Sequence, residues 1–131
     1  MRTGLSIGLH IRETLLGSTD FRQRAGERIH SFPAEQGVDV PYVTYAMARL
    51  APEYTKDGWD GDTVIVTVET VASDSSQCVE LAEVVREVLE ETPATYSDWQ
   101  VSDCELLGAM GGYSLDLGLS VISMEFAFNV K

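Results

Sequence analysis

The sequence predicts an α+β fold, an antiparallel β-sheet of about four strands with helices packed on one face. Residues 63–72 and 117–130 alternate apolar side chains with polar or small ones, as strands with one buried face do. After the first of these strands, apolar residues are spaced by three and four up to about Glu91, which is typical of an amphipathic helix. Such a helix needs an apolar surface, and the valine-rich strand before it is the nearest one.

The segment from Thr63 to Glu91 is the centre of this prediction. Asp74 is expected to cap the helix, because a short carboxylate accepts a hydrogen bond from a free amide of the first turn. Gln77, three residues on, completes the spacing of a capping box, and Pro93 ends the helix. The predicted core residues are Val64, Val66, Val68, Leu81, Val85, Val88, Leu89, Ile122, Met124, Phe126 and Phe128.

The other elements follow from shorter patterns and from glycine and proline positions. They are expected as a helix at 5–16, a short helix at 18–24, a brief strand at 27–32, a polar and flexible loop at 33–40, a strand at 41–51, a turn-rich linker at 52–62, a strand at 99–107 and a glycine turn at 108–112. The last two strands are expected to form a long hairpin. His10 is expected on the exposed side of the first helix.

Length and composition bound the class of protein. A chain of 131 residues predicts a single domain over 1–131. No apolar run approaches the roughly 18 residues that a membrane span needs, and the first residues lack a signal peptide's apolar core. Cys78 and Cys104 are expected to be unpaired thiols, which predicts a cytoplasmic origin.

The net charge of −12 is divided unevenly along the chain. Residues 1–56 hold six acidic and seven basic side chains, whereas residues 57–131 hold fifteen acidic and two basic ones, or +1 against −13. This argues against nucleic-acid binding, which needs a basic surface. Two interpretations stay open. The surface is simply acidic and soluble, or an arginine-bearing face (Arg22, Arg24, Arg28) meets an acidic face of the next copy on residues 57–131.

Three carboxylates fall within residues 57–62, at Asp57, Asp60 and Asp62. Oxygen ligands suit calcium, but the spacing does not match the twelve-residue calcium loop, so a hairpin turn is the preferred interpretation. His10 and His30 lack a cysteine partner for zinc.

No nucleophile elbow or phosphate loop occurs in the sequence. We therefore predict no catalytic, cofactor or metal site. Tyr54 and Trp59, two aromatic residues in a polar segment, either pack on their own domain or anchor a partner.

Several ordered motifs carry a family resemblance. They are Leu15–Leu16 on the first helix, the Gly-Glu-Arg-Ile step at 26–29, Pro-Tyr-Val-Thr-Tyr at 41–45, Asp60–Gly61, the helix pattern at 82–89 and a closing strand of alternating aromatic residues. In this order the chain resembles the tail-completion (tail-terminator) proteins of siphophages and prophages over nearly its whole length. Its glycine-rich last hairpin departs from the family pattern.

The resemblance implies a non-enzymatic structural protein that caps the tail tube as a ring, usually of six copies, and joins it to the head connector. Its partners would be further copies, the tail-tube protein and the head-connector protein, first in the host cytoplasm and then in the virion. DNA would pass the acidic ring without specific binding, and no membrane is involved. The alternative is a small α+β ligand- or peptide-binding module of bacterial origin; an unrecognised hydrolase is the weakest third.

Overall fold

A computed structural model describes residues 2–34, 37–91 and 93–131, and its six strands form one sheet in the order β1-β2-β3-β6-β5-β4. The strands are β1 (Ile29–Ser31), β2 (Tyr42–Thr55), β3 (Gly58–Ala72), β4 (Ala94–Thr95), β5 (Gln100–Ser114) and β6 (Leu119–Val130). The helices are the 3-10 turn η1 (Gly4–Ser6), α1 (Ile7–Leu16), α2 (Thr19–Ala25) and α3 (Ser75–Glu91). Residues 35 and 36 of the loop expected at 33–40 lie outside the described residues.

The predicted sheet of about four antiparallel strands with helices on one face is wrong. The sheet is mixed, because β1 runs parallel to β2, and it curls into a half-barrel. Strands β1 and β4 have three and two residues, too few for an alternating pattern of apolar and polar side chains to be recognised in the sequence. Register shifts interrupt β2 after Met47 and β5 after Leu106, and such bulges increase the local twist of a sheet.

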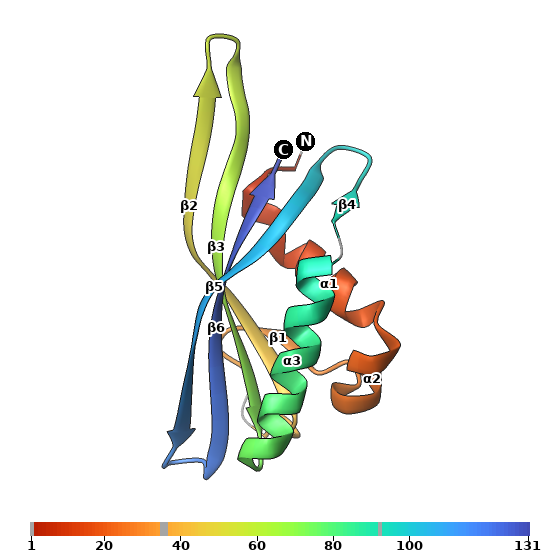
Figure 1. The fold of residues 1–131 in the computed structure, drawn as a ribbon, viewed down its shortest axis with the longest axis vertical. Helices are drawn as coiled ribbons and strands as arrows, with labels where there is room; N and C mark the ends of the chain where they lie inside the picture. The colour runs from red at the N-terminus through yellow and green to blue at the C-terminus, as the bar shows by residue number, and fades with distance from the viewer. Residues whose placement is uncertain (1, 35–36, 92) are drawn as a thin grey trace.

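Two long hairpins leave the centre of the sheet in opposite directions (Figure 1). Residues 52–62 are not a linker: β2 and β3 pair through this segment and turn at Lys56–Asp57. Residues 108–112 are not a turn either, because β5 continues to Ser114 and the chain reverses at 115–118. The predicted long hairpin of the last two strands is confirmed as β5–β6.

The core lies between α3 and the strands β3, β6 and β5, with α1 and α2 packed beside α3 (Figure 1). The predicted core is confirmed: nine of its eleven residues are buried, while Val88 and Ile122 are partly buried against it. The predicted exposure of His10 is wrong, since it is fully buried. His10 lies three residues after Ile7 and next to Ile11, on the buried stripe of α1.

Asp74 caps α3 as predicted, but the Gln77 side chain bonds the Ser73 hydroxyl where a capping box would use the Asp74 amide. The Gln77 amide donates to Asp74 Oδ1 at 2.8 Å, and the Ser73 hydroxyl donates to Gln77 Oε1 at 3.1 Å. Asp74→Ala is expected to lower the free energy of unfolding by about 1 kcal/mol, because a first-turn amide loses its acceptor. Urea denaturation would measure this loss. Asp74→Ser keeps a capping oxygen and is the control; an equal loss in both variants would contradict the capping role.

The two cysteines are free thiols, which confirms that prediction. Cys78 is buried, with its thiol 3.2 Å from the Thr70 carbonyl oxygen. Burial raises the pKa of the Cys104 thiol to about 12, and the nearby Glu90 and Asp103 add to the effect. None of the helices in the described part of the chain has the length and apolar character to cross a membrane.

Candidate interaction surfaces

Tyr54 and Trp59 face each other across the β2–β3 hairpin, near its tip. Tyr54 is 71% exposed, whereas Trp59 is half-buried and donates from Nε1 to Asp62 Oδ1 at 2.9 Å. The other oxygen of Asp62 accepts from the Gly4 amide at 2.8 Å. Trp59 is therefore packed on its own chain, and Tyr54 remains a candidate partner contact.

The carboxylates of Asp60 and Asp62 bind groups of the protein itself and hold this hairpin in place. Asp62 is buried and already accepts two hydrogen bonds, and Asp60 forms an ion pair with Lys131 at 3.4 Å. Among the residues that the structure describes, no group of three acidic, histidine or cysteine side chains is placed to hold a metal ion. The segment is part of a hairpin, as predicted, but the turn lies at Lys56–Asp57 and residues 58–62 belong to β3.

The three predicted arginines are engaged to different degrees. Arg24 forms ion pairs with Asp20 at 3.4 Å and Glu80 at 3.2 Å. Arg28 is half-buried and donates from Nε to the Pro41 carbonyl oxygen at 2.8 Å. Arg22 is exposed, and toward the residues that the structure describes its side chain makes a single 3.5 Å contact, to the Thr19 hydroxyl.

These arginines lie on α2 and just before β1, far from the tip of the β2–β3 hairpin (Figure 1). The five predicted interface residues therefore form two separate surfaces. Of these three arginines, Arg22 makes the weakest side-chain contacts within the chain.

The most apolar exposed surface lies on the outer part of the β5–β6 hairpin, residues 107–119, here called the β5–β6 arm. Five of the eleven exposed large hydrophobic residues belong to it: Leu107, Met110, Tyr113, Leu115 and Leu117. Leu115 is 87% exposed, and Cβ atoms built at Gly108, Gly111 and Gly112 would meet no neighbour within 4 Å. The register pairs Met110 with Ser123 and Tyr113 with Ser120, so apolar side chains project from both faces of the arm. Exposed apolar side chains concentrated on one hairpin indicate a protein contact.

Sequence reasoning missed the β5–β6 arm because its glycines suggested a turn. The usable signal was the composition of residues 106–119, where leucine, methionine and tyrosine alternate with glycine and only Asp116 is charged. Glycine weakens a strand without excluding it, so pairing with β6 decides the conformation here.

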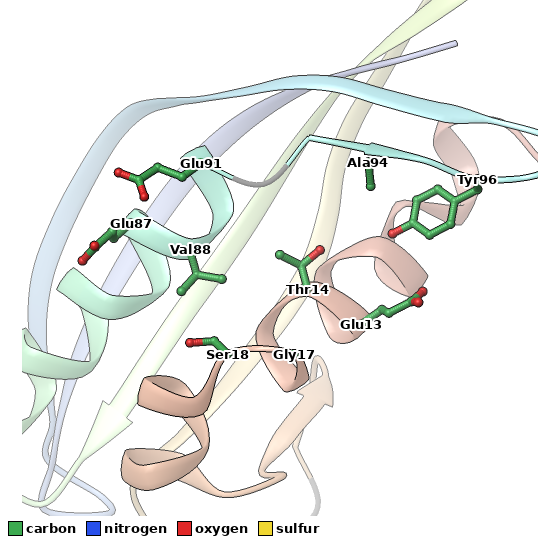
Figure 2. A pocket seen from close by; sticks show the side chains of 9 residues that line it. All are labelled: Glu13, Thr14, Gly17, Ser18, Glu87, Val88, Glu91, Ala94 and Tyr96. Atoms are coloured by element: carbon green, nitrogen blue, oxygen red, sulfur yellow. The ribbon is translucent and has the colours of Figure 1, made fainter.

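A groove of about 440 Å³ lies between α1 and α3 (Figure 2). Its charged lining residues are all acidic, Glu13, Glu87 and Glu91, and Tyr96 lies at one end. The described residues that line it include no imidazole, thiol or lysine.

Two titratable groups with shifted pKa values, His10 and Tyr96, lie next to each other. Burial lowers the pKa of His10 to about 4, and its Nδ1 lies 2.9 Å from the Tyr96 hydroxyl. Burial and the nearby Glu13 raise the pKa of Tyr96. His10 is fully buried in the core, whereas Tyr96 lies at one end of the groove between α1 and α3.

Comparison with known proteins gives a family and a fold. The model of the family "Tail completion protein gp17" matches residues 10–130. Among solved structures, a chain of the "Virion of native gene transfer agent (GTA) particle" matches with a TM-score of 0.79 and 14% identity, over 92% of this chain and 90% of that one. No curated protein sequence matches. At this identity the structural match supports the fold alone, whereas the family match spans almost the whole sequence. The chain belongs to the tail completion protein gp17 family.

Proposed function

We propose that this protein completes a phage or prophage tail, as a structural component without enzymatic activity. It caps the tail tube as a ring, with six copies as the expected number, and joins the tube to the head connector. The observation that carries the proposal is the family match over residues 10–130, which includes both hairpins. The protein would assemble in the host cytoplasm and remain in the virion.

The shape of the molecule supports this assignment. Two hairpins extend from the helix-covered centre in opposite directions, so one copy can reach partners on two sides (Figure 1). The β5–β6 arm offers apolar side chains for a tube, connector or neighbour contact. Arg22 on α2 offers a positive surface to the acidic residues 57–131 of another copy. The acidic half of the chain would let DNA pass a ring without adhering, since like charges repel.

The groove between α1 and α3 is the feature that a ligand- or peptide-binding module would use. We favour tail completion because the family match includes both hairpins, which a groove on the helical side does not explain.

Mixing the protein with tail tubes from the same genome should produce capped ends in electron micrographs. Leu115→Ser should reduce the capped fraction about tenfold, because an apolar anchor in a buried contact contributes more than 1 kcal/mol. Leu5→Ser is the matched control, a leucine 70% exposed on η1 and outside the β5–β6 arm. Arg22→Glu should weaken capping, because it replaces the positive charge of this surface with a negative one. High salt should also weaken capping, because salt screens the attraction between exposed charges, which at ordinary ionic strength extends about 8–10 Å.

Each outcome bears on a different part of the proposal. Bare tube ends with the wild-type protein would contradict the function itself. Equal capping by Leu115→Ser and Leu5→Ser would remove the β5–β6 arm from the contact. Unchanged capping by Arg22→Glu would remove the arginine surface.

A further inference from the structure

The sheet has two free strand edges. β1 pairs with β2 only at Val43–Tyr45, so the outer edge of β2 from residue 46 to 55 has no strand partner among the described residues. β4 pairs with β5 only at Gln100–Val101, which leaves the outer edge of β5 from 102 to 114 similarly free. Such an edge presents unpaired amide and carbonyl groups to another chain.

Arg49 and Glu105 end the same row of residues across the sheet. Arg49 is paired with Ile65 on β3, Ile65 with Ala127 on β6, and Ala127 with Glu105 on β5. Residues directly opposite one another on antiparallel strands point to the same face. One row thus carries a cation at its β2 end and an anion at its β5 end, and both side chains are exposed.

The direction of the strands fits a repeating contact. The steps from β2 to β3, β3 to β6 and β6 to β5 are each antiparallel, so β2 and β5 run in opposite directions. A second copy, rotated about an axis along the strands, would therefore place its β5 antiparallel to β2 of the first. In that arrangement Arg49 meets Glu105 at the same level.

The charges along the two edges are complementary. The β2 edge carries Arg49, with Lys56 in its turn and a single carboxylate at Glu53, while the β5 edge carries Asp103 and Glu105. Among the described residues no carboxylate forms an ion pair with Arg49, so its charge is available to a partner. Opposite charges facing each other across strands stabilise pairing, and like charges oppose it.

One amide of the β5 edge is covered within the chain. The Leu106 amide donates to Glu90 Oε1 at 3.3 Å, and the same oxygen lies 3.3 Å from Arg86 Nε. A carboxylate on an edge amide blocks strand addition, which is one way that proteins protect a free edge. Glu90 lies on α3 at a side-chain exposure of 31%, so an incoming strand can displace it.

We propose that residues 46–51 of β2 in one copy pair antiparallel with residues 103–108 of β5 in the next copy, with Arg49 opposite Glu105. This inference rests on the proposed function and specifies how neighbouring copies join. The two edges differ, so the contact is head-to-tail and closes into a ring when the rotation permits. β1 covers the edge of β2 before the proposed contact begins, and β4 covers the edge of β5 before it begins there. Displacement of Glu90 delays pairing until copies are concentrated on the tube.

A disulfide between copies tests the register. In a Cys104→Ala background, the double variant Arg49→Cys with Glu105→Cys is added to tail tubes, oxidised, and run on a non-reducing denaturing gel. Directly opposed strand residues lie close enough for a disulfide. The expected result is a ladder of covalent oligomers. Either single variant alone should give none, and a mixture of the two single variants should give only a dimer.

The outcomes separate this contact from the function. Tubes capped by the double variant without any ladder would overturn the strand pairing and leave tail completion intact. A covalent dimer from Arg49→Cys alone would show a symmetric contact and also overturn it. Wild-type protein that leaves the tubes bare on the same grids would count against the proposed function instead.

Charge reversal gives a second test that needs no new cysteine. Arg49→Glu and Glu105→Arg should each reduce ring formation on tubes at least about tenfold, because like charges then face each other. The double variant restores one opposite pair at every contact and should recover most of the wild-type level. Losses that simply multiply in the double variant would contradict the pairing of these two residues.

Discussion

Phe126→Ala is expected to lower the free energy of unfolding by about 3–5 kcal/mol. Phe126 is fully buried on β6, between Val66 of β3 and Leu106 of β5 in the same row. Its ring centroid lies 6.3 Å from that of Phe128. Truncation removes apolar contacts on both sides and leaves a cavity under α3, because the paired strands cannot close around it. Urea denaturation monitored by circular dichroism would measure the loss.

The matched control is Phe32→Ala, the same change at a side chain that is 59% exposed. Its cost should stay within about 0.5 kcal/mol, since surface substitutions leave most contacts intact. Similar losses in the two variants would show that β6 does not form the centre of the core.

Acid is expected to destabilise the protein through His10. Burial lowers the pKa of His10 to about 4 from an ordinary value of 6.5, so the folded protein keeps this imidazole neutral. The fully buried ring packs edge-on against Tyr96 and Phe128, and Nε2 has no hydrogen-bond partner among the described residues. Between pH 6.5 and 4 the unfolded chain binds a proton that the folded chain does not. Stability from this residue is therefore complete above pH 6.5, falls as the pH drops toward 4, and loses about 3 kcal/mol in total.

His10→Gln isolates this effect from the titration of carboxylates below pH 5. Both proteins would be unfolded with urea at several pH values between 7.5 and 4. The wild type should lose about 3 kcal/mol more than His10→Gln over this range. Parallel curves for the two proteins would contradict the assignment to His10. The variant is expected to start from a lower stability at pH 7.5, so the slopes are compared rather than the absolute values.

The long elements could be predicted from the sequence because their burial is regular. Val64, Val66 and Val68 alternate on β3 and are all fully buried, and Leu81, Val85 and Leu89 repeat along α3 and face them. Asp74 could be assigned as a cap because capping depends on residues a few positions apart. The family could be inferred from an ordered set of weak motifs, and the family model confirms it over residues 10–130.

Features that depend on distant pairing could not be predicted. The parallel pairing of β1 with β2 and the short pairing of β4 with β5 leave no periodic signal in two or three residues. The glycines at 108–112 have strand conformation because β6 supplies the hydrogen-bonding partner, against their own weak preference.

By itself, the sequence determined the main strands, the long helix, the buried valine and phenylalanine positions, the free thiols and the family, because each depends on local spacing or composition. It also showed the uneven charge, but not which charged residues lie opposite one another. Only the tertiary structure decided that His10 is buried, that a row of the sheet runs from Arg49 to Glu105, and that Glu90 covers the edge amide of Leu106. These features arise when strands far apart in the sequence pair in one register, and a shift of one residue would move every side chain to the other face.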